Sequence, residues 1–385
     1  MKEKIFTFLL IVLIIFPFGR TLWRERERYL SPFNLEQAQN LYNISQYTQG
    51  EGASWIPDEI LFAYAGWYYL QGGSPILVNP ENPPLGKYLI GLGIKFLNSE
   101  KILMPFFGFF SLGSFFLLSH WFFKKTWLAL IPVAFFSWER LFQEQLIYVS
   151  QFELFALTFL NLAFLFFLKG EEKRKYFLLS SFFVGALWGT RPWMATIPLL
   201  FSWGIYLAFL KKKLKIAFSW LLSLPIAVFV LLLAYSKLFL EGWGPYKVLS
   251  VQKWILWYHQ SRLINFGTIW PLIYLNRWYV WWGDQPFLPM VQWNIFWPIF
   301  TTLAIIFSCL VFLSLLKKRK KLRFLKIHSQ IIVLCFYYVF YLAFLSIGNV
   351  SSRYLFYLLP YGYLLGIYLL ANLDKKYFLK KLRKR

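Results

Sequence analysis

The feature that most constrains the fold is a series of apolar runs, each close to the length of a membrane-spanning helix. A helix needs about 20 apolar residues to cross roughly 30 Å of hydrocarbon. We read ten such runs, at residues 5–22, 102–122, 126–140, 146–168, 176–190, 192–210, 214–236, 294–316, 329–347 and 354–373. Only 15% of the residues are charged, against about a quarter in soluble domains. We therefore predict one all-α, polytopic transmembrane domain over residues 1–385, with about ten spans.

Basic residues gather in alternate connections between these runs. With the N-terminus inside, the inner connections hold 26 basic and four acidic residues, and the outer ones hold 15 and 13. Cytoplasmic loops are the basic ones, so both termini are predicted to be cytoplasmic. The net charge of +24 then reflects topology, and no nucleic-acid partner is expected. A bacterial-type cytoplasmic (inner) membrane fits, although the residues alone do not exclude the endoplasmic reticulum.

This topology leaves two large outer loops, residues 23–101 and 237–293. Within the first, the run 84–98 is short and holds Lys87 and Lys95, so we expect an interfacial helix rather than a span. The second carries eight of the 19 Trp residues. An aromatic belt at the headgroups explains most of them; the alternative is rings that stack on a sugar or a polyprenyl chain.

Acidic side chains at a membrane surface are costly and need a reason. Asp58 and Glu59 follow Pro57, which fits the first turn of a helix, where acids complement the dipole. The pair could simply cap the helix. Alternatively, one carboxylate could accept a proton from an acceptor hydroxyl. The spacing of the residues does not decide between these two roles.

Several basic residues also lie at the predicted outer helix ends. Arg140 and Glu144 are four residues apart and share a helix face, so an intrahelical ion pair is slightly preferred. Arg191 and Arg353 either extend to the interface or bind a lipid phosphate with their planar guanidinium groups.

Other chemistries lack support in the sequence. The two cysteines lie inside apolar runs and the three histidines fall on both faces, so no metal site is predicted. Motifs for nucleotide binding and serine hydrolysis are absent. No cofactor is required by these residues, and a divalent metal is possible but not implied.

Five segments in order resemble the integral-membrane glycosyltransferases of the C-type (GT-C) superfamily, in particular the protein O-mannosyltransferase-like branch. The matching residues are Asp58-Glu59 with A-x-x-Y-Y-L-x-G-G and Pro83-Pro84-Leu85-Gly86-Lys87, Arg140 with Glu144, Gly185 to Arg191, Tyr258-His259 with Thr268 to Pro271 and Trp281-Trp282, and Ser352-Arg353 to Pro360. The chain differs at Asn82, where the family usually has His, at Glu144 in place of Asp, and at Arg191 in place of Lys.

The resemblance implies transfer of a sugar from a polyprenyl-phosphate donor to an acceptor hydroxyl on the outer face, with inversion. Asp58 would be the general base, and Glu59 and Glu144 would position hydroxyl groups. The groups that would bind the lipid phosphate or the sugar are Lys87, Arg140, Arg191, Arg353, His259 and Asn82. Mannose is the expected sugar, with other hexoses or pentoses open.

Two alternatives remain. The same chemistry could transfer a sugar to lipid A, as aminoarabinose transferases do, or to an envelope polysaccharide. The sequence of the outer loops does not indicate which acceptor they bind. The protein could instead be a non-enzymatic transporter of lipid-linked sugars, although a transporter would be expected to place polar residues at mid-bilayer depth. The residue that comes nearest to such a mid-bilayer position is Glu153, and it lies near a predicted outer helix end.

Overall fold

A computed structural model describes residues 2–50, 52–148, 152–193, 195–209, 214–260, 265–280, 287–316 and 329–372. Apart from a two-stranded antiparallel ribbon, the elements in these ranges are helical. The ribbon pairs Trp278 of β1 (Trp278–Tyr279) with Leu288 of β2 (Phe287–Leu288).

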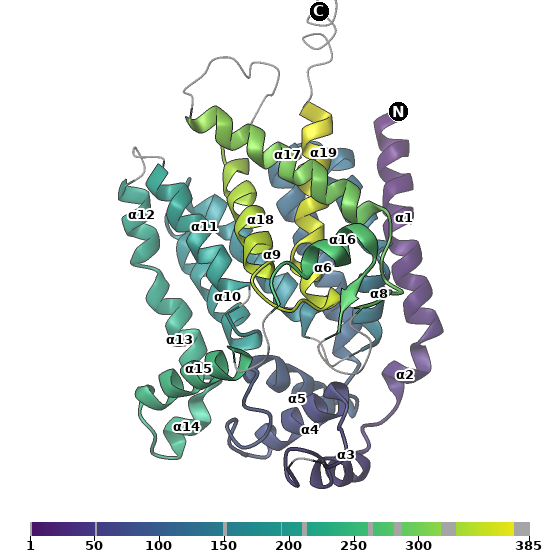
Figure 1. Ribbon diagram of the computed structural model, residues 1–385, viewed down its shortest axis with the longest axis vertical. Helices are drawn as coiled ribbons and strands as arrows, with labels where there is room; N and C mark the ends of the chain where they lie inside the picture. Colours follow the sequence, from purple (N-terminus) through teal and green to yellow (C-terminus); the bar gives the residue numbers. More distant parts are fainter. Residues whose placement is uncertain are drawn as a thin grey trace, which may run out of the picture.

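The long helices lie side by side along the long axis of the molecule (Figure 1). Each predicted apolar run contains at least one helix. These are α1 (Lys2–Arg24), α6 (Leu103–Phe123), α7 (Thr126–Ser137), α9 (Glu153–Gly170), α10 (Tyr176–Thr190), α11 (Thr196–Phe209), α12 (Leu214–Leu221) with α13 (Leu224–Ala234), α17 (Phe296–Leu316), α18 (Ile331–Leu345) and α19 (Leu359–Asn372).

Five helical segments in the described ranges are long and apolar enough to cross a membrane. They are Lys2–Arg24, Leu103–Phe123, Glu153–Gly170, Leu214–Ala234 and Phe296–Leu315. Shorter apolar helices fill the bundle between them. The chain is therefore a helical membrane protein, as predicted, while the number of ten crossings stays a prediction.

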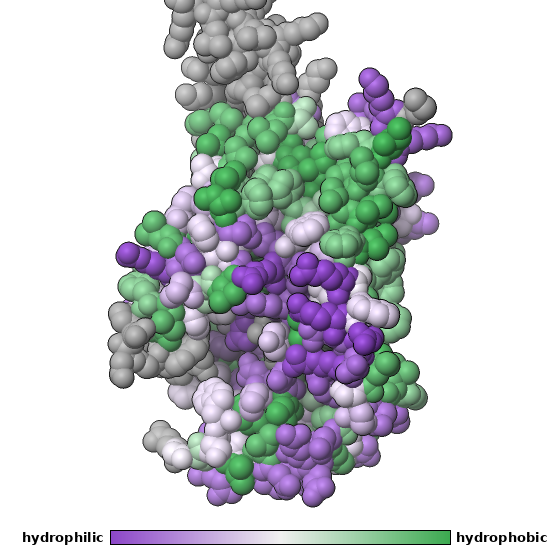
Figure 2. Space-filling model, turned by 90° about the vertical axis from the view of Figure 1, so that its right-hand side faces the viewer, coloured by the Kyte–Doolittle hydropathy of each residue, from purple (hydrophilic) through white to green (hydrophobic). Residues whose placement is uncertain are grey.

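Large apolar side chains also point outward from the bundle, as a lipid-facing surface requires. α1 exposes Phe8 and Ile15, and α6 exposes Phe109. Figure 2 shows hydrophobic residues gathered over the upper part of one face and polar residues below them.

Two predicted spans were placed wrongly at their outer ends. The helix in the run 126–140 ends at Ser137, and the long helix in the run 146–168, α9, begins at Glu153. Between them, a separate short helix, α8 (Arg140–Ile147), carries four polar side chains, Arg140, Gln143, Glu144 and Gln145. Four polar groups in eight residues are costly in hydrocarbon, so the chain turns at Glu139 instead of continuing.

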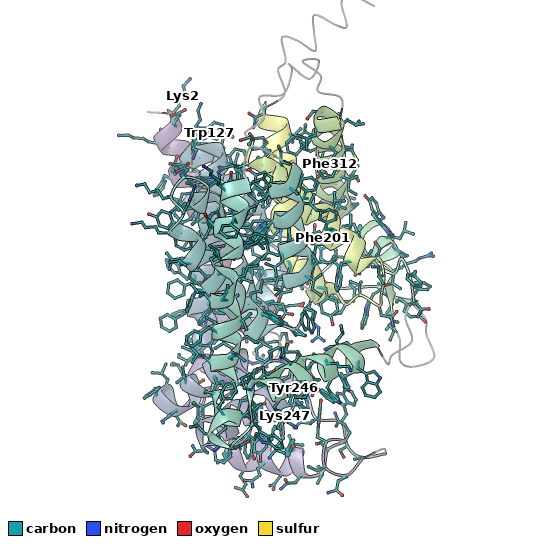
Figure 3. All side chains as sticks on the ribbon, turned by 90° about the vertical axis from the view of Figure 1, so that its left-hand side faces the viewer. Lys2, Trp127, Phe201, Tyr246, Lys247 and Phe312 are labelled. Atoms are coloured by element: carbon teal, nitrogen blue, oxygen red, sulfur yellow. The ribbon has the colours of Figure 1, made fainter. Side chains whose placement is uncertain are left out.

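A second layer of short helices covers one end of the bundle (Figure 1). The first outer loop contributes α2 (Arg26–Leu30), α3 (Leu35–Asn43), α4 (Asp58–Leu70) and α5 (Leu85–Leu97), and the second contributes α14 (Ser236–Leu240) and α15 (Pro245–Gln260). Ser74 Oγ donates to Glu241 Oε2 at 2.8 Å and joins the two loops. In Figure 3, Tyr246 and Lys247 lie in this layer and Lys2 and Trp127 lie at the opposite end.

The helix expected at 84–98 is α5, which packs closely against α4, and its place at the membrane interface stays a prediction. A Cβ added to Gly91 would lie 2.3 Å from the carbonyl oxygen of Gly66, and one added to Gly66 would lie 2.4 Å from the carbonyl oxygen of Lys87. Only glycine at both positions permits this approach of the two backbones. The close contact holds α4, whose first turn carries Asp58 and Glu59, against α5.

Two further short elements, α16 (Ile269–Leu275) and the 3₁₀ helix η4 (Ser352–Tyr357), lie next to the bundle. The segment η4 connects α18 to α19 and contacts both α8 and α9. It therefore brings Arg353 to the end of the bundle at which α9 begins.

Candidate active site

Asp58 and Arg353 meet although 295 residues separate them in the chain. Asp58 occupies the first turn of α4, directly after Pro57, so the predicted helix start is confirmed. Arg353 Nη1 lies 3.4 Å from Asp58 Oδ2, and the two side chains are 25% and 43% exposed. A carboxylate and a guanidinium are thus held together where solvent still reaches both.

A buried ion pair lies close to this exposed one. Arg191 Nη2 bonds to Glu153 Oε1, and the two side chains are 7% and 0% exposed. Glu153 also interacts electrostatically with Arg353, as does Asp58. The two carboxylates and two guanidiniums form one group of alternating charge, which we call the four-charge cluster.

Local sequence explains where the buried pair sits. Glu153 begins α9, where a carboxylate complements the helix dipole. Arg191 directly precedes Pro192 and is extended, with φ −125° and ψ 136°, because proline disfavours helical geometry in the residue before it.

Phe152 connects the buried pair to the first outer loop. Its ring stacks on Phe62 of α4 with centroids 4.5 Å apart, and the Arg191 guanidinium lies 5.5 Å from its centroid. One aromatic side chain thus packs α4, which carries Asp58, against the start of α9.

Glu59 is the second acid of the predicted pair. Its Oε2 is buried and has no hydrogen-bond partner among the residues that the structure describes. A buried oxygen that can still accept a hydrogen bond is unusual. Its predicted role in positioning a hydroxyl stays a prediction.

The ammonium of Lys87 is bonded inside its own loop. The side chain is fully buried, and Nζ donates to the carbonyl oxygens of Asn79 and Asn82, the latter at 2.8 Å, and to the Tyr69 hydroxyl at 3.3 Å. Burial lowers the pKa of Lys87 to about 7, although the nearby Glu81 carboxylate acts in the opposite direction. The contacts of Lys87 and Asn82 hold the loop, and their binding of a phosphate stays a prediction.

Arg140 and Glu144 do not bond to each other in the described part of the chain, contrary to the preferred ion pair. Arg140 Nη1 donates to the Val291 carbonyl oxygen at 2.9 Å, and Gln292 Nε2 donates to Glu144 Oε2 at 2.6 Å. Burial raises the pKa of Glu144, partly offset by Gln292 and Arg140. Both side chains therefore fasten α8 to the segment after β2.

His259 lies near the end of α15, in the second layer of short helices. Its ring is 5.5 Å from that of Tyr258, which stacks on Trp254 at 5.3 Å. Its predicted contact with substrate stays a prediction. Trp281 and Trp282 of the same resemblance lie outside the described residues.

Sequence reasoning missed Glu139, a buried carboxylate next to Arg140. Its oxygens accept hydrogen bonds from Tyr363, from Asn294 Nδ2 at 2.9 Å and from Trp297 Nε1 at 3.1 Å. These bonds tie the turn before α8 to α17 and α19. The only signal in the sequence was an acid at the edge of an apolar run, the same signal that marks Glu153.

Within the described ranges, no group of three or more His, Cys, Asp or Glu side chains is placed to hold a metal ion.

Comparison with known proteins gives structural likeness only. No family model and no curated protein matches the chain. Among solved structures, it is similar to ArnT from Cupriavidus metallidurans in the apo state, with a TM-score of 0.48 and 14% identity over 86% of this chain and 57% of that one. It is also similar to the same protein bound to undecaprenyl phosphate, with a TM-score of 0.47 and 13% identity over 82% and 56%. The chain thus spans little more than half the length of these structures, and at this level the likeness assigns it no activity.

Proposed function

We propose that the protein is a glycosyltransferase of GT-C type. It moves a sugar from a polyprenyl-phosphate carrier to an acceptor hydroxyl at the outer face of the membrane, with Asp58 as general base. The observation that carries the proposal is the contact between Asp58 and Arg353. It joins the first and last of the five motif segments in one partly exposed group of charges.

The cluster supplies the two kinds of group that the reaction needs. As the acceptor oxygen attacks the anomeric carbon, its proton passes to the Asp58 carboxylate. The bond between the sugar and the phosphate oxygen breaks, and its electron pair stays on the phosphate. A guanidinium close to that oxygen stabilises the developing charge, and Arg353 is the more exposed of the two candidates in the cluster.

No nucleotide is needed in this scheme because the carrier phosphate ester is already activated, and a divalent metal is compatible with it but not required. Donor sugar and acceptor are left open. Mannose and protein follow the motif resemblance, and lipid A or an envelope polysaccharide would use the same group of charges. A transporter of lipid-linked sugars is the competing function.

The test is transfer of label from radiolabelled polyprenyl-phosphate mannose to total membrane acceptors. We expect Asp58→Asn to lower the rate by about 10²- to 10⁴-fold, the usual contribution of a general base. Glu27→Gln is the matched control because Glu27 is also an acid of the first outer loop and its side chain is 90% exposed; it should transfer at the wild-type rate.

The extraction behaviour of the labelled product identifies the acceptor class. If wild type and Asp58→Asn transfer label equally, Asp58 is not the base. If no polyprenyl-phosphate sugar yields label with the wild-type protein while lipid-linked sugar still crosses the membrane, the transporter is the better description.

A further inference from the structure

The two arginines of the four-charge cluster differ in how far solvent reaches their side chains. Arg191 is buried against Glu153, which is itself fully buried. Arg353 is a quarter exposed, and its contact with Asp58, at 3.4 Å, is longer than the 2.7–2.9 Å that is typical of charge-assisted hydrogen bonds. Its Nε is buried and has no hydrogen-bond partner among the described residues.

The charges of the cluster also cancel, since two carboxylates face two guanidiniums. A phosphate that approaches Arg353 therefore meets the negative charge of Asp58 at the same guanidinium. Two like charges about 5 Å apart repel by an amount that depends strongly on how far water screens them. Glu153 is enclosed and cannot move away, whereas the Asp58 side chain is 43% exposed and can rotate into solvent.

We infer that the phosphate of the polyprenyl carrier and the Asp58 carboxylate compete for Arg353, so that donor binding displaces Asp58 and frees it to accept the acceptor proton. This inference rests on the proposed function. It makes the base available only when a donor is bound. After transfer, Asp58 loses its proton to water and returns to Arg353, which promotes release of the carrier phosphate.

A purely structural contact would behave differently. If Asp58 only fastened α4 to η4, its removal would leave Arg353 less well placed, and carrier binding would be unchanged or weaker. Competition predicts the opposite sign, namely tighter binding when the carboxylate is removed. The direction of the change therefore separates the two interpretations.

The experiment is a binding titration of undecaprenyl phosphate, without any sugar, against the full chain in nanodiscs of neutral lipid, followed by tryptophan fluorescence. We expect Asp58→Asn to bind about 3- to 30-fold more tightly than wild type, the range set by weak to moderate screening. Asp58→Ser removes the same charge and serves if the Asn variant does not fold. Glu27→Gln should bind like wild type.

A double substitution tests whether the gain depends on Arg353. Arg353→Gln alone should weaken binding, and adding Asp58→Asn to it should restore nothing, because the shared guanidinium is gone. Phosphatidic acid carries a phosphate on a different lipid and should bind more weakly. Equal binding of both lipids would overturn the assignment to a polyprenyl carrier.

The outcomes keep this inference apart from the proposed function. If Asp58→Asn abolishes transfer but binds undecaprenyl phosphate within twofold of wild type, or more weakly, the competition is refuted and the base assignment stands. If neither wild type nor any variant binds undecaprenyl phosphate, both proposals fail.

Discussion

We predict that the buried side chain of Lys87 makes the stability of the protein depend on pH. The side chain is fully buried in the first outer loop, and burial lowers its pKa to about 7 from the ordinary lysine value of 10.5. Between these two values the unfolded chain binds more protons than the folded one, so stability rises with pH. Below pH 7 both states are protonated and above 10.5 both are neutral, so the dependence is confined to this window.

The size of the effect follows from the two pKa values. The full difference corresponds to about 5 kcal/mol, of which about 2 kcal/mol is gained between pH 7 and pH 9. Lys87→Met removes the titrating group and should remove this gain, whatever its effect at a single pH. Lys95→Met is the matched control, because Lys95 lies on the same helix and is exposed.

The assay is thermal unfolding of the purified full chain in detergent at pH 7, 8 and 9, with hydrogen exchange of residues 79–90 as the local readout. Wild type and Lys95→Met should gain stability together as the pH rises, while Lys87→Met stays behind. Parallel curves for wild type and Lys87→Met would refute the reasoning, since they would show that Lys87 has the same proton affinity in both states.

Three further substitutions test how the site is held. Glu153→Gln leaves the Arg191 charge buried without its carboxylate and should cost about 3–5 kcal/mol; a thermal midpoint equal to that of the exposed control Glu172→Gln would speak against the pair. Gly91→Ala brings a Cβ to 2.3 Å from the Gly66 oxygen and should cost about 1–3 kcal/mol. Gly113→Ala, which has nothing within 4 Å, should be neutral or slightly stabilising, and the α4–α5 contact is not tight if the two variants melt alike. Glu139→Gln weakens the bonds from Asn294, Trp297 and Tyr363 and should cost about 1–3 kcal/mol, measured by the same melts; no loss would mean that α8 is anchored elsewhere.

Helix positions were predicted well where the signal is local. Each apolar run contains a helix, and the start of α4 at Asp58 follows from Pro57 and two acids. The errors fall at the two span ends beside the polar helix α8, which were predicted at residues 140 and 146, whereas α7 ends at Ser137 and α9 begins at Glu153. Hydropathy averaged over a span does not register a short turn, and the turn at Glu139 is stabilised by side chains from two distant helices.

Pairing of charges was predicted poorly for the same physical reason. The spacing of Arg140 and Glu144 correctly places them on one helix, but each bonds to residues 291–292, about 150 positions away. Lys87 matched a motif for a phosphate ligand, and that contact stays a prediction; what the motif did not indicate is that its ammonium donates to two carbonyl oxygens of its own loop. A sequence pattern identifies a charged group without stating which partner the fold presents to it.

By itself, the sequence determined that this protein is a bundle of apolar helices with its unusual polar residues near one end, because hydrophobic burial and loop charge are properties of each segment alone. Only the tertiary structure decided that Asp58 meets Arg353 across 295 positions and that Glu153 takes Arg191. Those choices depend on the close packing of α4 on α5 and on the position of η4 beside α9. Electrostatic pairing acts over a few ångströms, and such distances are set by the packing of elements that the chain order does not bring together.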